Sequence, residues 1–227
     1  MSQNTQLLNT IIKSNLDKIN DAIDASIRSK GLDPMGSVTS GSKSVLHMNM
    51  GGMYMNLQVN YSLTNLIGLS SFNITSLEVT DTSSADNGSK LTGDMMMSAA
   101  LHSTMDITIG GQIILSISYG KDSVGLSGSA SVSGVTISAP AQFEAGIEEG
   151  KICLNQVQID NVTLNYSNVA IQLNDLGHEL NELKAPIRSV IEDAVKDLIS
   201  MSFLLSGVVT PAINSGINDV LPKCSSS

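Results

Sequence analysis

The residues that could take part in catalysis are few and scattered along this chain of 227 residues. The three histidines are His47, His102 and His178, and no two of them have the spacing of a zinc site. Neither Cys153 nor Cys224 belongs to a Cys-x-x-Cys pair that could bind a metal or react as a redox couple. We therefore expect no metal, no cofactor and no catalytic residue.

One serine motif has the form of a hydrolase signature. The sequence "GLSGS" at 125–129 approaches G-x-S-x-G but has Ser129 in place of the last glycine; in α/β hydrolases that motif places a nucleophilic serine on a sharp turn between a strand and a helix. Here the flanking residues alternate between apolar and small polar side chains, which is typical of a continuous strand. A hydrolase would also need a histidine and an acid beside a serine of segment 125–134. We expect the motif to lie within a strand and the protein not to be an enzyme.

Methionines are concentrated in one part of the chain. Eight of the eleven fall between residues 48 and 105, and Met48, Met50, Met53 and Met55 flank the glycine pair 51–52. Unbranched, polarizable side chains of this kind either fill irregular core space or adapt to ligands of varied shape, and the sequence leaves both interpretations open. We expect a β-bulge at the two glycines that turns all four methionines toward one buried face.

Hydrophobic periodicity predicts a helix, then strands, then further helices. Steps of three and four predict an amphipathic helix over about residues 5–30 and a helical segment over about 176–221, which Pro186, Ser206-Gly207 and Pro211 divide into two or three pieces. Between about 43 and 174 the period is two. The order predicts a single α+β domain over 1–227, with the helices packed on one face of a long, highly curved antiparallel β-sheet.

Charge and hydropathy exclude several classes of protein. The net charge is −9, and the lysines and arginines are scattered, so we expect no nucleic-acid partner and little attraction to anionic lipids. No apolar run approaches the roughly 18 residues that a transmembrane helix needs. The first residues, "MSQNTQLLNTIIKSN", lack the pattern of a signal peptide.

Two features bear on the compartment. Cys153 and Cys224 permit one disulfide, and five Asn-x-Ser/Thr sequons fit an exported surface, although such sequons also arise by chance in a chain so rich in asparagine and serine. The residues alone therefore leave the compartment open, and they also leave open whether the chain forms a homodimer.

Two segments resemble a known family. The helix that runs into "KGLDPM" at 30–35 and the C-terminal "VVTPAINSGINDVLP" at 208–222 resemble the dust-mite group 7 allergens and, more broadly, the tubular lipid-binding superfamily, which includes bactericidal permeability-increasing, juvenile-hormone-binding and takeout-like proteins. The resemblance implies a curved sheet wrapped around a long C-terminal helix, an N-terminal helix beside it, an apolar site for lipids, and secretion. In the permeability-increasing relatives a disulfide ties the sheet to the helix, and Cys153 and Cys224 match that role.

The leading hypothesis is a non-enzymatic carrier of a lipid or other hydrophobic small molecule. The alternative is an interfacial or interaction protein, such as a surfactant, a coat component or a sensor of bacterial lipids, that uses the same apolar faces. The ligand would occupy a cavity between the sheet and the helices. We expect that cavity to be lined by Met48, Met50, Met53, Met55, Met105, Ile107 and Ile109 from the sheet and by Ile19, Ile23, Ile191, Val195 and Ile199 from the helices.

Overall fold

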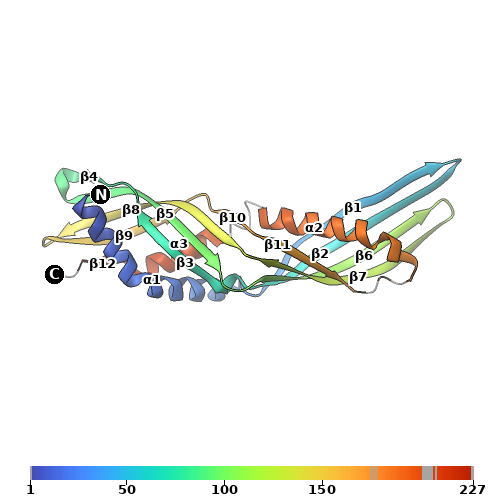
Figure 1. The fold of residues 1–227 in the computed structure, drawn as a ribbon, viewed down its shortest axis with the longest axis horizontal. Helices are drawn as coiled ribbons and strands as arrows, with labels where there is room; N and C mark the ends of the chain where they lie inside the picture. Colours follow the sequence, from blue (N-terminus) through green and yellow to red (C-terminus); the bar gives the residue numbers. More distant parts are fainter. Residues whose placement is uncertain (1, 175, 177, 201–206, 208, 226–227) are drawn as a thin grey trace.

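The computed structural model describes residues 2–174, 176, 178–200, 207 and 209–225, with the backbone alone at 50, 87, 178, 179 and 181. The fold is α+β, with a long curled antiparallel sheet, an N-terminal helix and C-terminal helices. Figure 1 shows an elongated molecule in which α2 lies toward one extremity and α1 and α3 toward the other. We call these two parts the α2 end and the α1–α3 end.

At the α2 end, five antiparallel strands pair in the order β1-β2-β6-β7-β11. Their bounds are β1 Met35–Met50, β2 Met53–Ile67, β6 Met105–Ile117, β7 Gly120–Ser133 and β11 Asn168–Leu173. The helix α2, Lys184–Ser200, packs against β11 and β1, which are the two edge strands, and is preceded by the short helix η3, His178–Leu183. The sheet therefore curls until one helix lies over the seam between its edges.

At the α1–α3 end, strands pair in the order β12-β9-β8-β5-β3, with β10 beside β8 and β4 beside β5. The bounds are β3 Phe72–Val79, β4 Ser83–Ala85, β5 Lys90–Leu101, β8 Thr136–Glu148, β9 Lys151–Ile159, β10 Thr163–Asn165 and β12 Lys223–Cys224, with the short helices η1 Leu69–Ser71 and η2 Asp86–Gly88 between strands. The helix α1, Gln3–Ser29, packs against β3, and α3, Thr210–Val220, packs against β9. Because α1 and α3 also pack on each other, this end is closed by a pair of helices.

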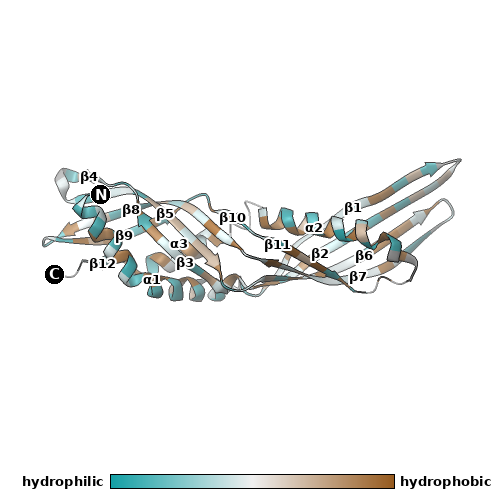
Figure 2. Ribbon diagram, viewed as in Figure 1, coloured by the Kyte–Doolittle hydropathy of each residue, from teal (hydrophilic) through white to brown (hydrophobic). Residues whose placement is uncertain are grey.

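The sequence of α1 accounts for its position. Ser2 caps the helix, because its side chain accepts a hydrogen bond from the Thr5 N–H at 3.2 Å. Its buried stripe consists of Leu8, Ile11, Ile12, Ile19, Ile23 and Ile27, at the spacing that the sequence predicts. Figure 2 shows the matching alternation of hydrophobic and hydrophilic residues along the strands. Among the described helices, none has both the length and the hydropathy to cross a membrane.

Four asparagine side chains fasten the helices to the edges of the sheet at the α1–α3 end. The bonds to the sheet backbone run from the Val79 N–H to Asn9 (2.8 Å), the Ile74 N–H to Asn20 (2.7 Å), the Ile159 N–H to Asn214 (2.8 Å) and the Val157 N–H to Asn218 (3.1 Å). The amides of Asn20, Asn214 and Asn218 also donate to carbonyls of the same strand residues. A primary amide offers both a donor and an acceptor, so it takes the place of a neighbouring strand at an exposed edge.

Two further features hold this end together. A Cβ at Gly216 of α3 would lie 2.6 Å from the Ile23 Cα of α1, so only glycine allows the two helices to approach this closely. The disulfide that the family resemblance implied is present, because Cys153 on β9 is bonded to Cys224 on β12, directly after α3.

The C-terminal helical segment is divided, as its prolines predict. Pro186 lies in the first turn of α2 and Pro211 in the first turn of α3, where the missing N–H costs no hydrogen bond. The two helices do not form one continuous rod. They lie at opposite ends of the molecule, so each covers a different part of the curled sheet (Figure 1).

The expected β-bulge at the glycine pair 51–52 is wrong. The two glycines form the turn of a hairpin between β1 and β2, with φ of +59° and +83°, which glycine adopts without strain. The register pairs Met48 with Met55 and Met50 with Met53. Residues directly opposite on antiparallel strands share a face, so the four methionine positions do lie on one face, through a turn rather than a bulge.

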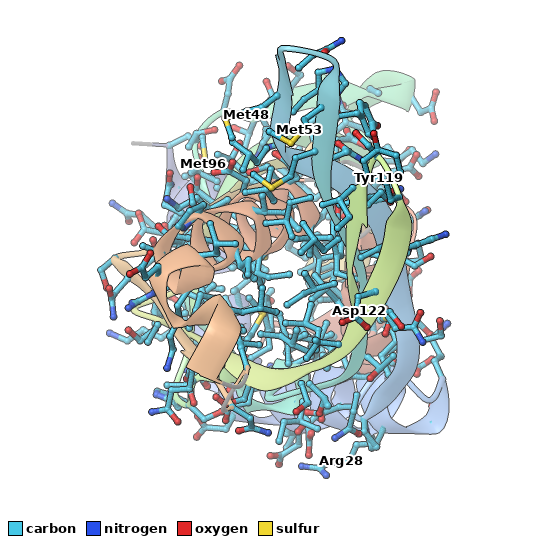
Figure 3. All side chains as sticks on the ribbon, turned by 90° about the vertical axis from the view of Figure 1, so that its right-hand side faces the viewer. Arg28, Met48, Met53, Met96, Tyr119 and Asp122 are labelled. Atoms are coloured by element: carbon cyan, nitrogen blue, oxygen red, sulfur yellow. A yellow bond between two sulfur atoms is a disulfide. The ribbon has the colours of Figure 1, made fainter. Side chains whose placement is uncertain are left out.

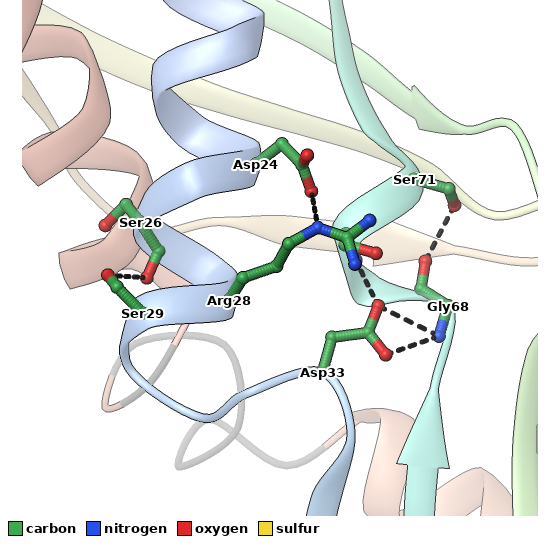
Figure 4. A network of polar contacts seen from close by, with 8 residues as sticks. Asp24, Ser26, Arg28, Ser29, Asp33, Gly68 and Ser71 are labelled. Carbon is green, nitrogen blue, oxygen red and sulfur yellow. Dashed lines mark hydrogen bonds and ion pairs between the residues drawn. The ribbon is translucent and has the colours of Figure 1, made fainter.

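Asp33, just after α1, contacts the segment at 68–71, which we call the junction because the chain passes there from β2 at the α2 end to β3 at the α1–α3 end (Figure 4). Its carboxylate accepts hydrogen bonds from the backbone N–H groups of Gly68 at 3.2 Å and Ser70 at 2.6 Å. Burial alone would raise the pKa of Asp33, but the hydrogen bonds from Ser70 and Gly68 and the charge of Arg28 outweigh it and hold the pKa below its ordinary value. The carboxylate is therefore the form that stabilises this junction.

Candidate functional site

The register at the α2 end places apolar side chains in rows across one face of the sheet. Three successive rows are Met48–Met55–Ile117, Leu46–Leu57–Leu115–Asp122 and Val59–Ile113–Val124. Leu57, Val59 and Ile113 are buried, which identifies this face as the inner one. The first row lies next to the hairpin turns, where the long strands β1, β2 and β6 extend past the buried core. Met48 and Ile117 in that row are therefore exposed.

A groove that we call the inner groove lies over the second and third rows. Its volume is about 240 Å³. It is lined by Leu46, Met55, Leu57, Ile113, Leu115, Asp122, Val124, Leu180, Glu182 and Leu183. The last three residues belong to η3, which lies over the inner face of the sheet here. The charged residues in this set are two carboxylates, Asp122 and Glu182, and both are exposed.

A second groove, the tip groove, lies between the turns of the β1–β2 and β6–β7 hairpins. Its volume is about 270 Å³, and its lining is Met48, Met53, Tyr54, Met55, Ile117, Ser118 and Tyr119. Figure 3 looks onto this end and shows Met48 and Met53 on the β1–β2 hairpin with Tyr119 beside them. Met55 lines both grooves, so the apolar surface continues from the tips of the hairpins to the inner face under η3.

This arrangement suits a hydrophobic small molecule. Together the two grooves fall within the range of about 300–1,000 Å³ that is typical of small-molecule sites, and their lining is mainly aliphatic and methionine side chains. Two larger grooves lie at the α1–α3 end. One, of about 460 Å³ between α1 and β3, has a mixed lining in which Lys13 and Glu78 accompany Ile12, Leu16 and Leu77. The other, beside β5 and β8, has a volume of about 400 Å³ and is lined mainly by Asp, Glu, Gln, Ser and Thr residues, which offer little apolar surface.

Three of the four predicted methionines line this site. Met48 and Met55 lie in the same row, and Met53 is at the turn with 68% of its surface exposed. The backbone of Met50 pairs with Met53, but its side chain lies outside the described residues. These residues form an accessible groove, not a closed cavity.

The other predicted residues are in the core, and the structure does not bring them all together. Ile107, Ile109, Ile191, Val195 and Ile199 are each no more than 2% exposed at the α2 end. Met105 lines an enclosed apolar void of about 10 Å³, room for about one water molecule. Ile19 and Ile23 lie on α1 at the other end, because α1 pairs with α3 and not with α2. Among the described residues, no single cavity is lined by both helices and the methionines.

Several residues of the site were not predicted from the sequence. They are Tyr54, Ile117 and Tyr119 at the hairpin tips and Leu180 and Leu183 on η3. Ile117 and Tyr119 continue the alternation of residues 113–117 and would by that pattern alone lie on a buried face, whereas Ile117 is 50% and Tyr119 is 95% exposed. The available signal was Ser118 and Gly120, since small residues and glycine between two alternating runs mark a hairpin turn, where side chains are exposed.

The residues considered for catalysis occupy structural positions. The "GLSGS" motif lies within β7, with Ser127 opposite Gly110 of β6, and its hydroxyl accepts a hydrogen bond from the Asn174 amide at 2.9 Å. The rings of His47 and Tyr54 pack in a T-shaped arrangement, with their centroids 5.3 Å apart and their planes at 76°. The side chain of His178 lies outside the described residues.

Among known proteins, solved structures are similar to this chain, but the chain matches no protein-family model and no curated protein sequence. A crystal structure of lipopolysaccharide binding protein aligns with 94% of this chain at 14% identity and a TM-score of 0.36, and the chain spans 38% of that protein. Takeout 1 of Epiphyas postvittana aligns with 95% of this chain and 92% of its own, at 13% identity and a TM-score of 0.35.

Proposed function

We propose that this protein is a non-enzymatic carrier of a neutral hydrophobic small molecule, which it binds in the inner and tip grooves of the α2 end. The observation that carries the proposal is the continuous apolar lining from Met53 at the hairpin turn to Leu180 under η3. An alkyl chain laid along it gains about 0.8 kcal/mol for each CH₂ group removed from water. The methionines adapt to chains of different shape, which favours a broad ligand class.

The charge of the lining favours an uncharged ligand. Asp122 interrupts a row whose other members are leucines, and Glu182 faces the same groove from η3. A fatty-acid carboxylate would be repelled by both side chains, whereas a hydroxyl group could donate a hydrogen bond to either carboxylate and an ester group carries no charge for them to repel. We therefore infer that the ligand is a neutral lipid or a similar alcohol or ester.

The covalent chemistry of the chain supports an extracellular role. A disulfide between Cys153 and Cys224 persists in oxidising compartments. Two of the sequon asparagines, Asn161 and Asn165, are exposed, where a glycan could be attached. We propose that the carrier acts outside the cell, with the hydrophobic molecule as its partner and without nucleic acid.

The experiment that tests the carrier is a titration of delipidated protein with a neutral fluorescent lipid analogue in vesicle-free buffer. The variant Val124→Trp fills the inner groove, and the matched control Ile67→Trp introduces the same side chain at a site of equal exposure, 38% against 37%, that lines neither groove. We expect Val124→Trp to weaken binding by about tenfold or more, equivalent to about 1.4 kcal/mol, and Ile67→Trp to leave it within about twofold.

The same titration separates the carrier from the interfacial alternative. A surfactant or coat protein would show no saturable binding of a soluble ligand, although its apolar faces could adsorb to an interface. Absence of saturation in the wild-type protein, or equal weakening by both tryptophan variants, would contradict the proposed site.

A further inference from the structure

We propose that the two hairpin tips of the α2 end dock onto a zwitterionic lipid surface, so that the carried molecule passes between that surface and the tip groove. This inference rests on the proposed function, because it gives the groove its source of ligand. The docking surface consists of Met53, Tyr54, Ile117 and Tyr119. Met53 and Tyr119, which Figure 3 labels, lie at the end of the molecule that faces the viewer there.

Exposure of large apolar side chains is concentrated at these tips. Tyr119 is 95% exposed, Met53 is 68% exposed and Ile117 is 50% exposed, and all three lie within two residues of a hairpin turn. Elsewhere among the described residues, the large apolar side chain with the greatest exposure is Met96 at 46%. Side chains that project from convex turns can enter a lipid interface without opening the protein core, and tyrosine rings favour the boundary between lipid headgroups and acyl chains.

Charge selects the kind of lipid surface. Segments 47–56 and 113–121, which make up the two tips, contain no aspartate or glutamate, although the chain as a whole carries a net charge of −9. The only permanent charge in these segments is that of Lys121, and the next residue is Asp122. A nearly neutral tip on an acidic protein suits a zwitterionic surface, because an anionic surface would repel the rest of the molecule.

The opposite end of the molecule provides an internal contrast. The β8–β9 hairpin there turns through Glu149 and Gly150, directly after Glu148 at the end of β8, and both carboxylates are exposed. Its one large exposed apolar residue is Ile147, at 37%. Two hairpin ends of the same chain therefore differ in the property that controls contact with lipid, and only one of them leads into an apolar groove.

The position of the tip groove links docking to exchange of ligand. Its lining includes all four residues of the docking surface, and Met55 continues it to the inner groove. A lipid that leaves a docked surface between the two turns would meet apolar side chains throughout. A lipid surface also accommodates two separate convex turns by deforming, whereas a second protein copy would need a complementary rigid surface.

Single-tryptophan reporters test the docking directly, because the natural chain contains no tryptophan. Tyr119→Trp places the reporter on the docking surface, and Ile147→Trp places it at the opposite end. On addition of phosphatidylcholine vesicles, we expect the emission of Tyr119→Trp to move to shorter wavelength and that of Ile147→Trp to stay unchanged. In a flotation assay, M53S/Y119S should reduce the vesicle-bound fraction by about tenfold, while Met96→Ser should bind as the wild type does.

Three results would overturn the inference. The first is an unshifted Tyr119→Trp spectrum, and the second is an equal shift at both reporters. The third is a shift without vesicles that grows with protein concentration and accompanies a dimer in sedimentation, since the tips would then contact a second copy. The vesicle-free titration of the wild-type protein decides the carrier function separately, so saturable ligand binding without vesicle binding would reject the docking alone.

Discussion

The two ends of this molecule are built on one plan but fastened in different ways. Each is a curled antiparallel sheet whose edges are covered by helix. At the α1–α3 end, asparagine amides bond the helices to the sheet edges, a disulfide joins β9 to β12, and a glycine lets α1 and α3 touch. At the α2 end, within the part of the chain that the structure describes, an ion pair between Lys43 of β1 and Asp193 of α2 joins the helix to one sheet edge at 3.1 Å, and its side chains are 54% and 52% exposed.

The two ends therefore differ in how easily their helices can separate from the sheet. Backbone edges that are satisfied by partly buried amides cannot separate without losing hydrogen bonds, so the α1–α3 end is held as a unit. A helix that is held to an apolar sheet face by side-chain packing can separate from it and return at a lower cost in free energy. The grooves with apolar lining and the exposed hairpin tips lie at that second end.

The largest expected effect concerns the disulfide. The double variant C153A/C224A opens a link between residues 71 positions apart, which should lower the free energy of unfolding by about 4 kcal/mol. Urea denaturation monitored by circular dichroism measures the loss. Under conditions where the variant is folded, its ligand affinity should match that of the wild type, because the grooves lie at the other end. A large fall in affinity would show that the two ends are not independent.

The next effect concerns the contact between α1 and α3. Gly216→Ala puts a methyl group 2.6 Å from the Ile23 Cα, and the helices must move apart, at a cost of about 3 kcal/mol. Gly125→Ala on β7 is the matched control, because a Cβ there meets no atom within 4 Å. Thermal unfolding of both variants makes the comparison, and equal melting temperatures would contradict the close approach.

The contacts that hold the helices to the sheet at the two ends can be compared by removing one polar group from each end. Asn218→Ala leaves the backbone N–H and C=O of Val157 without their partner, which should cost about 2 kcal/mol. Lys43→Gln removes only an exposed ion pair at the α2 end and should cost less than about 1 kcal/mol. Chemical denaturation of both variants measures the loss of unfolding free energy at each end. A larger loss for Lys43→Gln would show that the α2 end is the more firmly held of the two.

A smaller effect, dependent on pH, is expected at the junction. The folded-state pKa of Asp33 lies below its ordinary value of 3.8, so its carboxylate stabilises the fold above that pH and the contribution is lost as the pH falls through the folded-state value. Asp33→Asn should therefore cost about 1 kcal/mol at pH 7, and the difference from the wild type should shrink below about pH 4. Denaturation curves across this range measure it, and a difference that grows in acid would show the opposite linkage.

The sequence predicted the elements better than their connections. The apolar steps of α1 and the alternation of strands such as β6 follow from local geometry, which is why both were predicted. The pattern around the glycine pair 51–52 fits a bulge and a hairpin equally in one respect, since either puts the flanking methionines on one face. Two glycines of positive φ distinguish the hairpin, because such a turn matches the twist of the strands it joins.

The site could be predicted only in part, because its position depends on contacts that are distant in sequence. Ile19 and Ile191 show the same helical period, and nothing local indicates that their helices pack on different parts of the sheet. The row that joins Leu46, Leu57 and Leu115 to Asp122 depends on the register of three hydrogen-bonded strand pairs. The methionines were found because their residue type is distinctive, but the leucines of η3 were not.

The smallest expected effect concerns the preference of the inner groove for uncharged over charged ligands. Asp122 and Glu182 place negative charge beside an otherwise apolar groove, so a fatty alcohol should bind about threefold more tightly than the fatty acid of equal length. The variant D122N/E182Q removes both charges at nearly constant shape and should abolish that preference, as should high salt, because both carboxylates are exposed and screened. Competition against the neutral fluorescent analogue measures the ratio. A preference that persists in the variant would mean that the groove distinguishes the ligands by shape, and that its apolar rows rather than its carboxylates set the specificity.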